Sequence, residues 1–411
     1  MTGNSSADHA TVFALEDAAS AIASARRASL ADRYAASSLT AEWRNLAELE
    51  TVVKPWRDLA ARALEPNVFY EPAFALGAAA VFGRDAGAVL IWSGGSPRRL
   101  LGFFPARVQT RRYGVKLPVL VGWTHPYAPL GVPLVEREAA EPVLAAFLAQ
   151  LATDRALPGL WLLPFLPAQS PFASALDAIV RRAQMPVADV NRRERALLAP
   201  GGERADYVEN ALGPRKQKEL RRLGRRLSEL GAVLFTSATK PAAVAAATED
   251  FLVLEARGWK GRAGTAMAAH DDLRRFLRTA VDRLAAEGKV CIARILLDGR
   301  AIAAAIVLRS GPTAWFWKIA YDEALARFSP GVMLTVALTE ELTDDVTLAQ
   351  ADSCANSYHP MIDHIWRQRL VLVDRLLAAR PEVPFAHVRR LEMLRTAAIM
   401  AAKVMRDRLR R

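Results

Sequence analysis

The sequence predicts a mixed α/β protein made of two halves. Short apolar runs typical of buried strands alternate with longer stretches in which apolar residues recur every three or four positions. The turn-forming segment Pro200-Gly201-Gly202 interrupts this alternation, which then resumes. A hydrophobic content of 52% is ample for a core and excludes wholesale disorder. We therefore expect one domain over residues 40–200 and a second over residues 201–380.

The two ends of the chain depart from this pattern. Residues 1–39 are rich in Ala and Ser and have few large apolar side chains, which predicts a disordered tail. Residues 381–411 are basic, and apolar side chains from Val388 to Leu409 recur at helical spacing. We expect a basic amphipathic helix at this end.

In the first half, Thr40 is a candidate N-cap for a helix that runs from Ala41 to about Leu64. In the elements that follow, apolar residues recur at the spacing of a helix or of a strand, and Gly or Pro residues mark the boundaries. They are a helix at 72–82, strands at 88–93 and 99–110, a helix at 138–152, a strand at 159–165, a helix at 171–183 and a strand at 187–198. Residues 118–135 contain W-T-H-P-Y-A-P and predict a long irregular loop, whose aromatic residues argue against disorder.

The second half opens with a strongly basic helix at 214–230. Its leucines form one buried stripe, and Gly231 ends the helix. Asp298-Gly299 is a strong hairpin signal between two strands. The other elements are expected in this order: strand 232–237, helix 241–256, loop 258–261, helix 271–287, strands 290–297, 301–308 and 315–321, helix 332–342, a strand at 346–351 that ends in Asp352, and a strand at 365–375.

Residues 314–331 join a strand, a tight loop and a helix N-terminus. Pro330 suits the first turn of a helix, and Ser329 stands at the N-cap position. The free backbone N–H groups of such a terminus bind phosphate or another anion. The same residues also fit an ordinary strand-to-helix turn that binds only water, so the local sequence leaves both interpretations open.

Charge and cysteine content restrict the partners and the compartment. The net charge of +12 favours anionic partners such as nucleic acid, anionic lipid or phosphorylated compounds. Cys291 and Cys354 cannot form a disulfide framework and fit a reducing compartment. The N-terminus does not have the pattern of a signal peptide, and the longest apolar run, at 301–308, is too short to span a bilayer. We expect a cytoplasmic protein without a membrane span.

Several chemistries lack their sequence signatures. The chain has no G-x-x-x-x-G-K-[ST], G-x-G-x-x-G, H-E-x-x-H, C-x-x-C or G-x-S-x-G, which argues against P-loop hydrolysis, Rossmann redox chemistry, zincin proteolysis and α/β-hydrolase esterolysis. His359 and His364 follow Asp352 closely, but a metal site needs a third ligand at a position that the sequence does not give. We expect no metal.

Four segments in order carry a family resemblance. They are R-K-Q-K-E-L-R-R-L-G-R-R-L-S-E-L-G at 215–231, F-L-V-L-E-A-R-G-W-K-G-R at 251–262, L-D-G-R-A-I-A-A-A-I at 297–306 and W-K-I-A-Y-D-E-A-L-A-R-F-S-P-G-V-M-L at 317–334. From about residue 213 to 375 the chain resembles the GNAT-type acyltransferase domain of the family associated with bacterial cellulose and exopolysaccharide biosynthesis (CelD/BcsL-like). The resemblance implies two tandem GNAT-like halves, distantly related to Fem-type aminoacyl transferases, with acetyl-CoA or another acyl-CoA as the donor.

The resemblance also implies where the donor and the acceptor bind. The donor pyrophosphate would lie on the turn after the central strand, and a backbone N–H at the strand end would polarise the thioester carbonyl. The residues expected to bind the donor are Ile319, Ala320, Arg327, Ser329, Gly331 and Val332. The residues expected to bind the acceptor are Trp259, Lys260, Trp317 and Lys318.

The catalytic residues are expected at the carboxyl ends of two strands and in the loop beyond them. Tyr321 ends the central strand, and Asp352 ends the strand expected beside it in parallel. Related chains often carry a lysine after a tyrosine in the following loop, where this sequence has His359. His359 is therefore the candidate base, and Asp352 would orient its ring.

These features predict an acyl-CoA-dependent N- or O-acyltransferase, with acetyl as the transferred group. The resemblance implies a sugar, envelope or exopolysaccharide precursor, or another small amine, as the acceptor. Two alternatives stay open. A Fem-like transferase would use aminoacyl-tRNA, with the basic helix contacting the RNA, and a non-catalytic member would bind a partner in an exopolysaccharide system.

Overall fold

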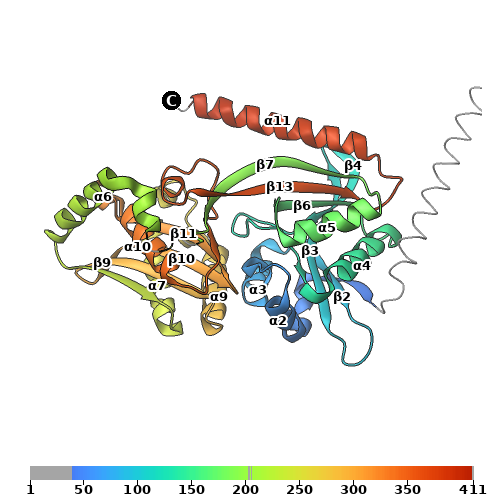
Figure 1. Cartoon of the computed structure of the whole chain (residues 1–411), viewed down its shortest axis with the longest axis horizontal. Helices are drawn as coiled ribbons and strands as arrows, with labels where there is room; N and C mark the ends of the chain where they lie inside the picture. The colour runs from blue at the N-terminus through green and yellow to red at the C-terminus, as the bar shows by residue number, and fades with distance from the viewer. Residues whose placement is uncertain (1–38, 202–203, 205, 410–411) are drawn as a thin grey trace, which may run out of the picture.

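A computed structural model describes residues 39–201, 204 and 206–409. The described strands form one mixed sheet in the order β1-β2-β3-β4-β6-β13-β7-β12-β11-β10-β9-β8, with β5 paired to β3. Helices pack on this sheet in both lobes of the molecule (Figure 1), which confirms the mixed α/β class. The tail predicted for residues 1–39 lies, apart from Leu39, outside the described residues.

The first half follows the apolar pattern from residue 72 onward. Pro72 stands in the first turn of its helix, where a backbone N–H would have no partner within the helix. Ser170 caps another helix by accepting a hydrogen bond from the Ala173 N–H at 3.2 Å. The strands are β1 (Thr40–Asn45), β2 (Ala86–Trp92), β3 (Leu100–Arg112), β4 (Val115–Gly122), β5 (Leu134–Val135), β6 (Leu160–Pro167) and β7 (Val187–Leu198), and the helices are α2 (Val53–Arg62), α3 (Pro72–Phe82), α4 (Ala140–Thr153) and α5 (Pro171–Arg182).

Two predictions for the first half are wrong in part. The helix expected at 41–64 is instead β1, a 3-10 helix at Leu46–Val52, and α2. Its apolar spacing fits a helix, but β1 pairs antiparallel with β2, with Trp43 opposite Val89, and this pairing outweighs the local pattern. The loop expected at 118–135 begins as β4, which pairs in parallel with β6, and it ends as β5.

The second half follows most of the predicted order of elements, but the loop expected at 258–261 contains the short helix α8, and the strand expected at 346–351 is shortened to β12. The Asp298-Gly299 turn joins two antiparallel strands, and both residues have positive φ angles, 48° and 79°. A kink at Gly213 precedes the basic helical segment. The strands are β8 (Val233–Ala238), β9 (Val290–Leu297), β10 (Arg300–Ser310), β11 (Thr313–Tyr321), β12 (Gln350–Asp352) and β13 (Gln368–Ala378), and the helices are α6 (Tyr207–Ser228), α7 (Pro241–Arg257), α8 (Trp259–Arg262), α9 (Asp271–Ala286), α10 (Pro330–Asp344) and α11 (Phe385–Leu409).

The two halves share strands. β13, which comes from the end of the second half, lies between β6 and β7 of the first half. β7 also pairs with β12 of the second half. Figure 1 shows β7 and β13 as long strands that run between the two lobes. Backbone hydrogen bonds, as well as side-chain packing, therefore hold the halves together.

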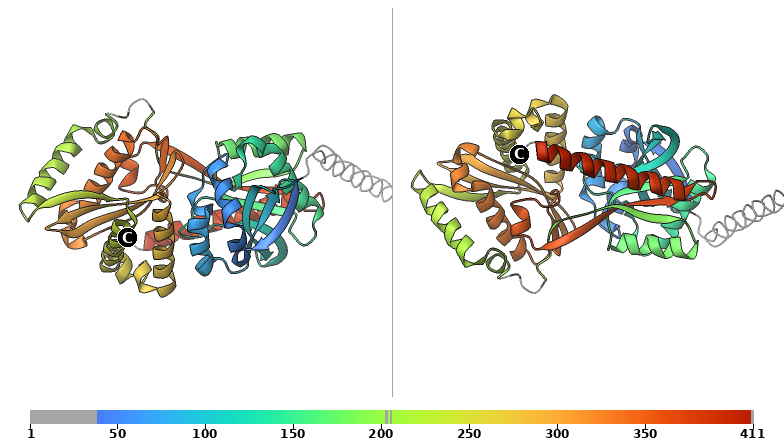
Figure 2. Two further views of the ribbon diagram at one scale, coloured as in Figure 1. Left: turned by 90° about the horizontal axis from the view of Figure 1, so that it is seen from below. Right: turned by 90° about the horizontal axis from the view of Figure 1, so that it is seen from above.

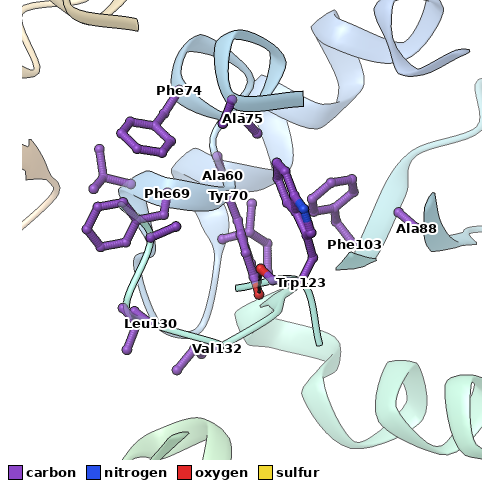
Figure 3. Close-up of a cluster of buried hydrophobic side chains, with 14 of the residues drawn as sticks. Ala60, Phe69, Tyr70, Phe74, Ala75, Ala88, Phe103, Trp123, Leu130 and Val132 are labelled. Atoms are coloured by element: carbon purple, nitrogen blue, oxygen red, sulfur yellow. Dashed lines mark hydrogen bonds between the residues drawn. The ribbon is translucent and has the colours of Figure 1, made fainter. Parts of the chain in front are cut away.

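The hydrophobic core continues from one half into the other. α3 of the first half packs so closely on α9 of the second that a Cβ on Gly77 would lie 3.6 Å from the Ala280 Cβ. Figure 3 shows the part of this core around Tyr70, whose hydroxyl donates to the Trp123 carbonyl oxygen at 2.8 Å. This bond fixes the start of the aromatic loop, which then reaches β11 of the second half.

The last helix, α11, leaves the sheet and lies over β7 and β13 on the outer side of the molecule (Figures 1 and 2). In the part of the chain that the structure describes, no helix combines the length and the apolar character that a membrane span requires.

Candidate active site

A β-bulge interrupts β11 near its middle. Ile306 and Val307 are adjacent on β10, but they pair with Lys318 and Phe316, so Trp317 is an extra residue without a partner. The side chains of Trp317 and Lys318 are consecutive, yet both lie on the face of the sheet that α7 and α9 cover. The bulge thus presents two predicted acceptor residues side by side.

β11 has an open edge beyond the bulge. β12 pairs with β11 only as far as Trp315. On the other edge, the Asp322 N–H donates to the Ile302 carbonyl of β10 at 2.8 Å. Because an antiparallel ladder alternates, Ile319 and Tyr321 direct their backbone N–H groups away from β10. These two N–H groups therefore face a stretch of edge that no described strand covers.

The same alternation separates two predicted donor residues. Ala320 directs its backbone groups at β10, and its side chain is buried in the core. Of the two predicted residues within the strand, Ile319 therefore offers its N–H to the open edge and Ala320 does not.

The turn into α10 brings Gly331 against Tyr321. After a 3-10 helix at Glu323–Phe328, Ser329 adopts a left-handed conformation with φ of 55°, and Pro330 begins α10. Ser329 stands at the N-cap, as predicted, but its side chain makes no capping hydrogen bond. A Cβ on Gly331 would lie only 3.0 Å from Cδ1 of Tyr321. A predicted donor residue and a predicted catalytic residue are thus neighbours.

The start of α10 offers few free N–H groups. Pro330 has none, and the N–H groups of Val332 and Met333 both donate to the Ser329 carbonyl oxygen, at 3.0 and 3.1 Å. The Gly331 N–H has no partner within the described chain. The exposed Arg327 holds its guanidinium over the Phe328 ring, 4.8 Å from the ring centre. An anion at this turn would therefore meet Gly331 and Arg327 first.

On the opposite face of β11, two predicted acceptor residues contact Glu255 of α7, and a third, Trp317, lies beside them against Tyr127. Oε1 of Glu255 lies 3.3 Å from the Lys318 Nζ and 3.0 Å from the Lys260 Nζ. Trp317 donates its indole N–H to the Tyr127 carbonyl oxygen at 2.9 Å. The Lys318 Nζ also lies 4.7 Å from the centre of the Tyr127 ring. We call these five residues the Glu255 cluster.

Trp259, the fourth predicted acceptor residue, is the exposed neighbour of this cluster. It begins α8, and 59% of its surface is accessible. Its backbone N–H donates to Glu323 at 2.6 Å, and Arg262 at the other end of α8 pairs with the same carboxylate. Glu323 therefore ties α8 to the turn that precedes α10.

Burial changes the acid–base properties of the Glu255 cluster. Desolvation lowers the pKa of Lys318 to about 8, although the Glu255 carboxylate opposes this change. Burial by itself would raise the pKa of Glu255, but Lys318 and Lys260 outweigh it and the pKa is lowered. Lys318 is therefore a cation that can lose its proton near physiological pH.

We expect Lys318→Met to remove a specific pH dependence of stability. The folded-state pKa of Lys318 is depressed, so between about pH 8 and 10.5 the unfolded chain binds the proton more tightly than the folded chain. The free energy of unfolding should rise across this window by on the order of 3 kcal/mol more in the wild type than in the variant. Urea denaturation at several pH values measures the difference.

Lys289→Met is the matched control for this measurement. Lys289 is also partly buried, but its pairs with Glu71 and Glu287 raise its pKa. Its contribution should be present at neutral pH and be lost as the pH rises past the ordinary lysine pKa. Parallel pH profiles for wild type and Lys318→Met would contradict the depressed pKa.

Sequence reasoning missed Glu255 and Tyr127. Glu255 lies four residues after Phe251 on the buried stripe of α7, and an acidic residue at such a position is the signal that could have identified it. Tyr127 belongs to the aromatic loop of the first half, and nothing in the sequence assigns it to β11. The first half therefore contributes directly to this region.

Asp352 does not lie beside Tyr321. It pairs with Trp315, six residues earlier on β11, which is about 20 Å away along the strand. Its buried carboxylate pairs with Arg195 of β7 and accepts the Cys354 N–H at 2.9 Å. This geometry explains Asp352 as a link between β12 and β7, and it does not support Asp352 as the orienter of a catalytic base.

His359 lies in the loop after β12, which folds back onto α10. The Thr335 hydroxyl contacts the Met361 sulfur at 3.6 Å. Nδ1 of His359 lies 3.3 and 3.5 Å from the backbone nitrogens of Met361 and Ile362, so both hydrogen bonds are long and weak. Burial lowers the pKa of His359, with Asp363 opposing, so the ring is neutral at pH 7.

A groove of about 470 Å³ lies away from these residues, where α2 and α3 of the first half meet α9 of the second. Its lining includes Val53, Leu76 and the ion pair between Arg57 and Glu287, and it contains none of the predicted site residues. Among the described side chains, no group of three or more His, Cys, Asp or Glu residues is arranged to hold a metal ion.

Comparison with known proteins gives a family match over the segment that contains β11. Residues 214–356, from α6 to the loop after β12, match the model of the acetyltransferase (GNAT) domain. No curated protein matches the sequence. The structure is similar to that of FemX, with a TM-score of 0.52 and 8% identity over 79% of this chain and 95% of that chain.

Two further solved structures resemble the chain over most of its length. The C-terminal domain of a proposed lysylphosphatidylglycerol synthetase from Agrobacterium fabrum has a TM-score of 0.50 and 12% identity, over 85% of this chain and 97% of that chain. A tandem GNAT protein from the clavulanic acid biosynthesis pathway has a TM-score of 0.41 and 16% identity, over 84% of this chain and 99% of that chain. At these identities FemX and the synthetase domain show a common fold only.

The sequence match, and not these structural similarities, carries the assignment to a reaction class. A GNAT acetyltransferase domain implies an acyl-CoA co-substrate. Residues 214–356 match this domain model, and the match supports an acyltransferase.

Proposed function

We propose that the protein transfers an acetyl group from acetyl-CoA to an amine or hydroxyl of a small acceptor. The observation that carries the proposal is the open edge of β11, where the N–H groups of Ile319 and Tyr321 face a gap in the sheet beside Gly331. A thioester carbonyl in this gap would accept backbone hydrogen bonds that strengthen as negative charge develops on its oxygen. The donor pyrophosphate would then reach Gly331 and Arg327.

The two faces of β11 have different proposed roles. The donor lies along the α10 face and the open edge, and the acceptor approaches from the face with the Glu255 cluster. The acceptor nitrogen or oxygen attacks the carbonyl carbon, the C–S bond breaks, and CoA leaves as a thiolate. The acceptor proton passes to a base and from there to the thiolate. His359, which is neutral at pH 7, is the proposed base, and Tyr321 is the alternative.

The acceptor class rests on the sequence resemblance to the exopolysaccharide-associated family. We propose a sugar, envelope or exopolysaccharide precursor in the cytoplasm. The exposed indole of Trp259 supports this choice, since its apolar face with a polar N–H at the edge can pack against a sugar ring.

Calorimetry with acetyl-CoA and longer acyl-CoA thioesters tests the donor assignment. Tight binding of acetyl-CoA, together with release of free CoA in the presence of an amino sugar, is the expected result. Failure of every acyl-CoA thioester to bind the folded protein would overturn the proposal.

A second candidate function rests on the surface of α6. Seven exposed cations follow one another along this helix, and only Lys216 has an ion-pair partner among the described residues, Glu219. They are Arg215, Lys216, Lys218, Arg221, Arg222, Arg225 and Arg226. A row of exposed cations attracts a polyanion, so a Fem-like transferase that takes its acyl group from aminoacyl-tRNA is the alternative.

The salt dependence of tRNA binding distinguishes this alternative. If α6 contacts RNA, the logarithm of the affinity should fall with the logarithm of salt concentration by roughly 0.7 for each phosphate neutralised. Arg221→Ala combined with Arg225→Ala should then reduce both affinity and slope, whereas Arg111→Ala combined with Lys116→Ala on the β3–β4 hairpin should not. Absent or salt-independent binding would leave acyl-CoA as the donor.

A further inference from the structure

The second part of α11 carries an apolar stripe that nothing in the described chain covers. Val388 is buried in a small cluster on the sheet, and Glu392 is held by Arg112 at 2.8 Å. From Met393 to Ala402, Thr396 is half-buried and every other described side chain is exposed. The helix is therefore anchored by its first turns and extends beyond its anchor.

The stripe has a regular spacing. Its members follow one another at intervals of three and four residues, which places them on one side of the helix. They are Leu391, Leu394, Ala398, Ala401 and Met405. Leu394 lies about 160° around the helix from the buried Glu392, so the stripe turns away from the sheet. Leu394 and Met405 are each 67% exposed.

Basic side chains border the stripe on both sides. By the same helical geometry, Arg390 lies on one border and Arg395 on the other. The whole segment 381–411 has eight arginine and lysine residues against three aspartate and glutamate residues. One of those acidic residues, Glu392, is buried and pairs with both Arg112 and Arg395. The exposed surface of α11 is therefore apolar and positively charged.

We propose that α11 binds the surface of an anionic lipid membrane, with the stripe in the interface and the arginines at the phosphate level. A helix with this distribution lies in the plane of an interface and does not cross it. Figure 1 shows α11 as the outermost described element on its side of the molecule, so a flat bilayer can reach it without meeting the rest of the fold.

Charge favours a membrane over a second copy of the chain. A symmetric pairing of two stripes would bring the basic borders of the two copies together, and like charges beside an apolar seam repel. Anionic phosphate groups neutralise these arginines, so each basic residue near such a surface strengthens binding. The long arginine stems can also cover the apolar residues between them.

Vesicle sedimentation of the full-length protein tests the proposal. We expect binding to vesicles of equal parts phosphatidylglycerol and phosphatidylcholine, weaker binding to phosphatidylcholine alone, and release at high salt. Leu394→Asp combined with Met405→Asp should weaken binding to the anionic vesicles by about tenfold or more. Both positions are exposed, so the fold should persist, which circular dichroism checks.

A matched variant controls for the added negative charge. Leu234→Asp combined with Val346→Asp makes the same change at exposed apolar positions on other elements, where the side chains are 57% and 82% exposed. It should bind vesicles nearly as the wild type does. Equal loss in both variants, or no binding by the wild type, would overturn the proposal. So would a dimer, seen by light scattering, that only the α11 variant abolishes.

Discussion

Replacing Gly331 with glutamate is expected to weaken acyl-CoA binding by about 100-fold or more. The Gly331 N–H is the unpaired backbone donor at the start of α10, and a carboxylate there would occupy the space of the pyrophosphate and repel it. The new Cβ would also lie 3.0 Å from the Tyr321 ring, which would have to shift. Titration calorimetry with acetyl-CoA measures the change.

Two further variants separate charge from crowding. Gly331→Ala adds the same Cβ without the charge and should weaken binding much less. Gly224→Glu makes the same substitution on α6, where a Cβ would meet no atom within 4 Å, and it should leave acetyl-CoA affinity unchanged. A folded Gly331→Glu protein with wild-type affinity would show that the donor does not bind at this turn.

Replacing His359 with alanine is expected to lower turnover by about 10²–10⁴-fold and to leave acyl-CoA affinity nearly intact. The variant would remove the proposed base without touching the donor turn. Burial lowers the pKa of His359, so the ring stays neutral, and the wild-type rate should persist to lower pH than an exposed histidine would allow. Steady-state kinetics over a range of pH measures both effects.

His364→Ala is the control in the same loop, because His364 is an exposed histidine whose loss should change the rate little. If His359→Ala kept the wild-type turnover and pH profile, the base would lie elsewhere. Tyr321→Phe is then the next variant, since Tyr321 lies at the open edge beside Gly331.

The sequence alone determined the features that depend on neighbouring residues. Apolar periodicity and turn residues predicted most elements from residue 72 onward, including the Asp298-Gly299 hairpin. The proposed donor turn could also be predicted from the sequence, because Tyr321, Ser329 and Gly331 lie within one strand–turn–helix segment. Short-range sterics and hydrogen bonding set the geometry of such a segment, and these are local properties of the chain.

Only the tertiary structure decided how distant segments meet. The register of β12 placed Asp352 beside Trp315 and paired it with Arg195, far along the strand from Tyr321. The packing of the halves brought Tyr127 to Lys318. Strand register and cross-half contacts depend on which buried surfaces fit together and which charges find partners. Those energies arise between residues that can lie far apart in the chain, 280 positions for Arg112 and Glu392, and no local pattern predicts them.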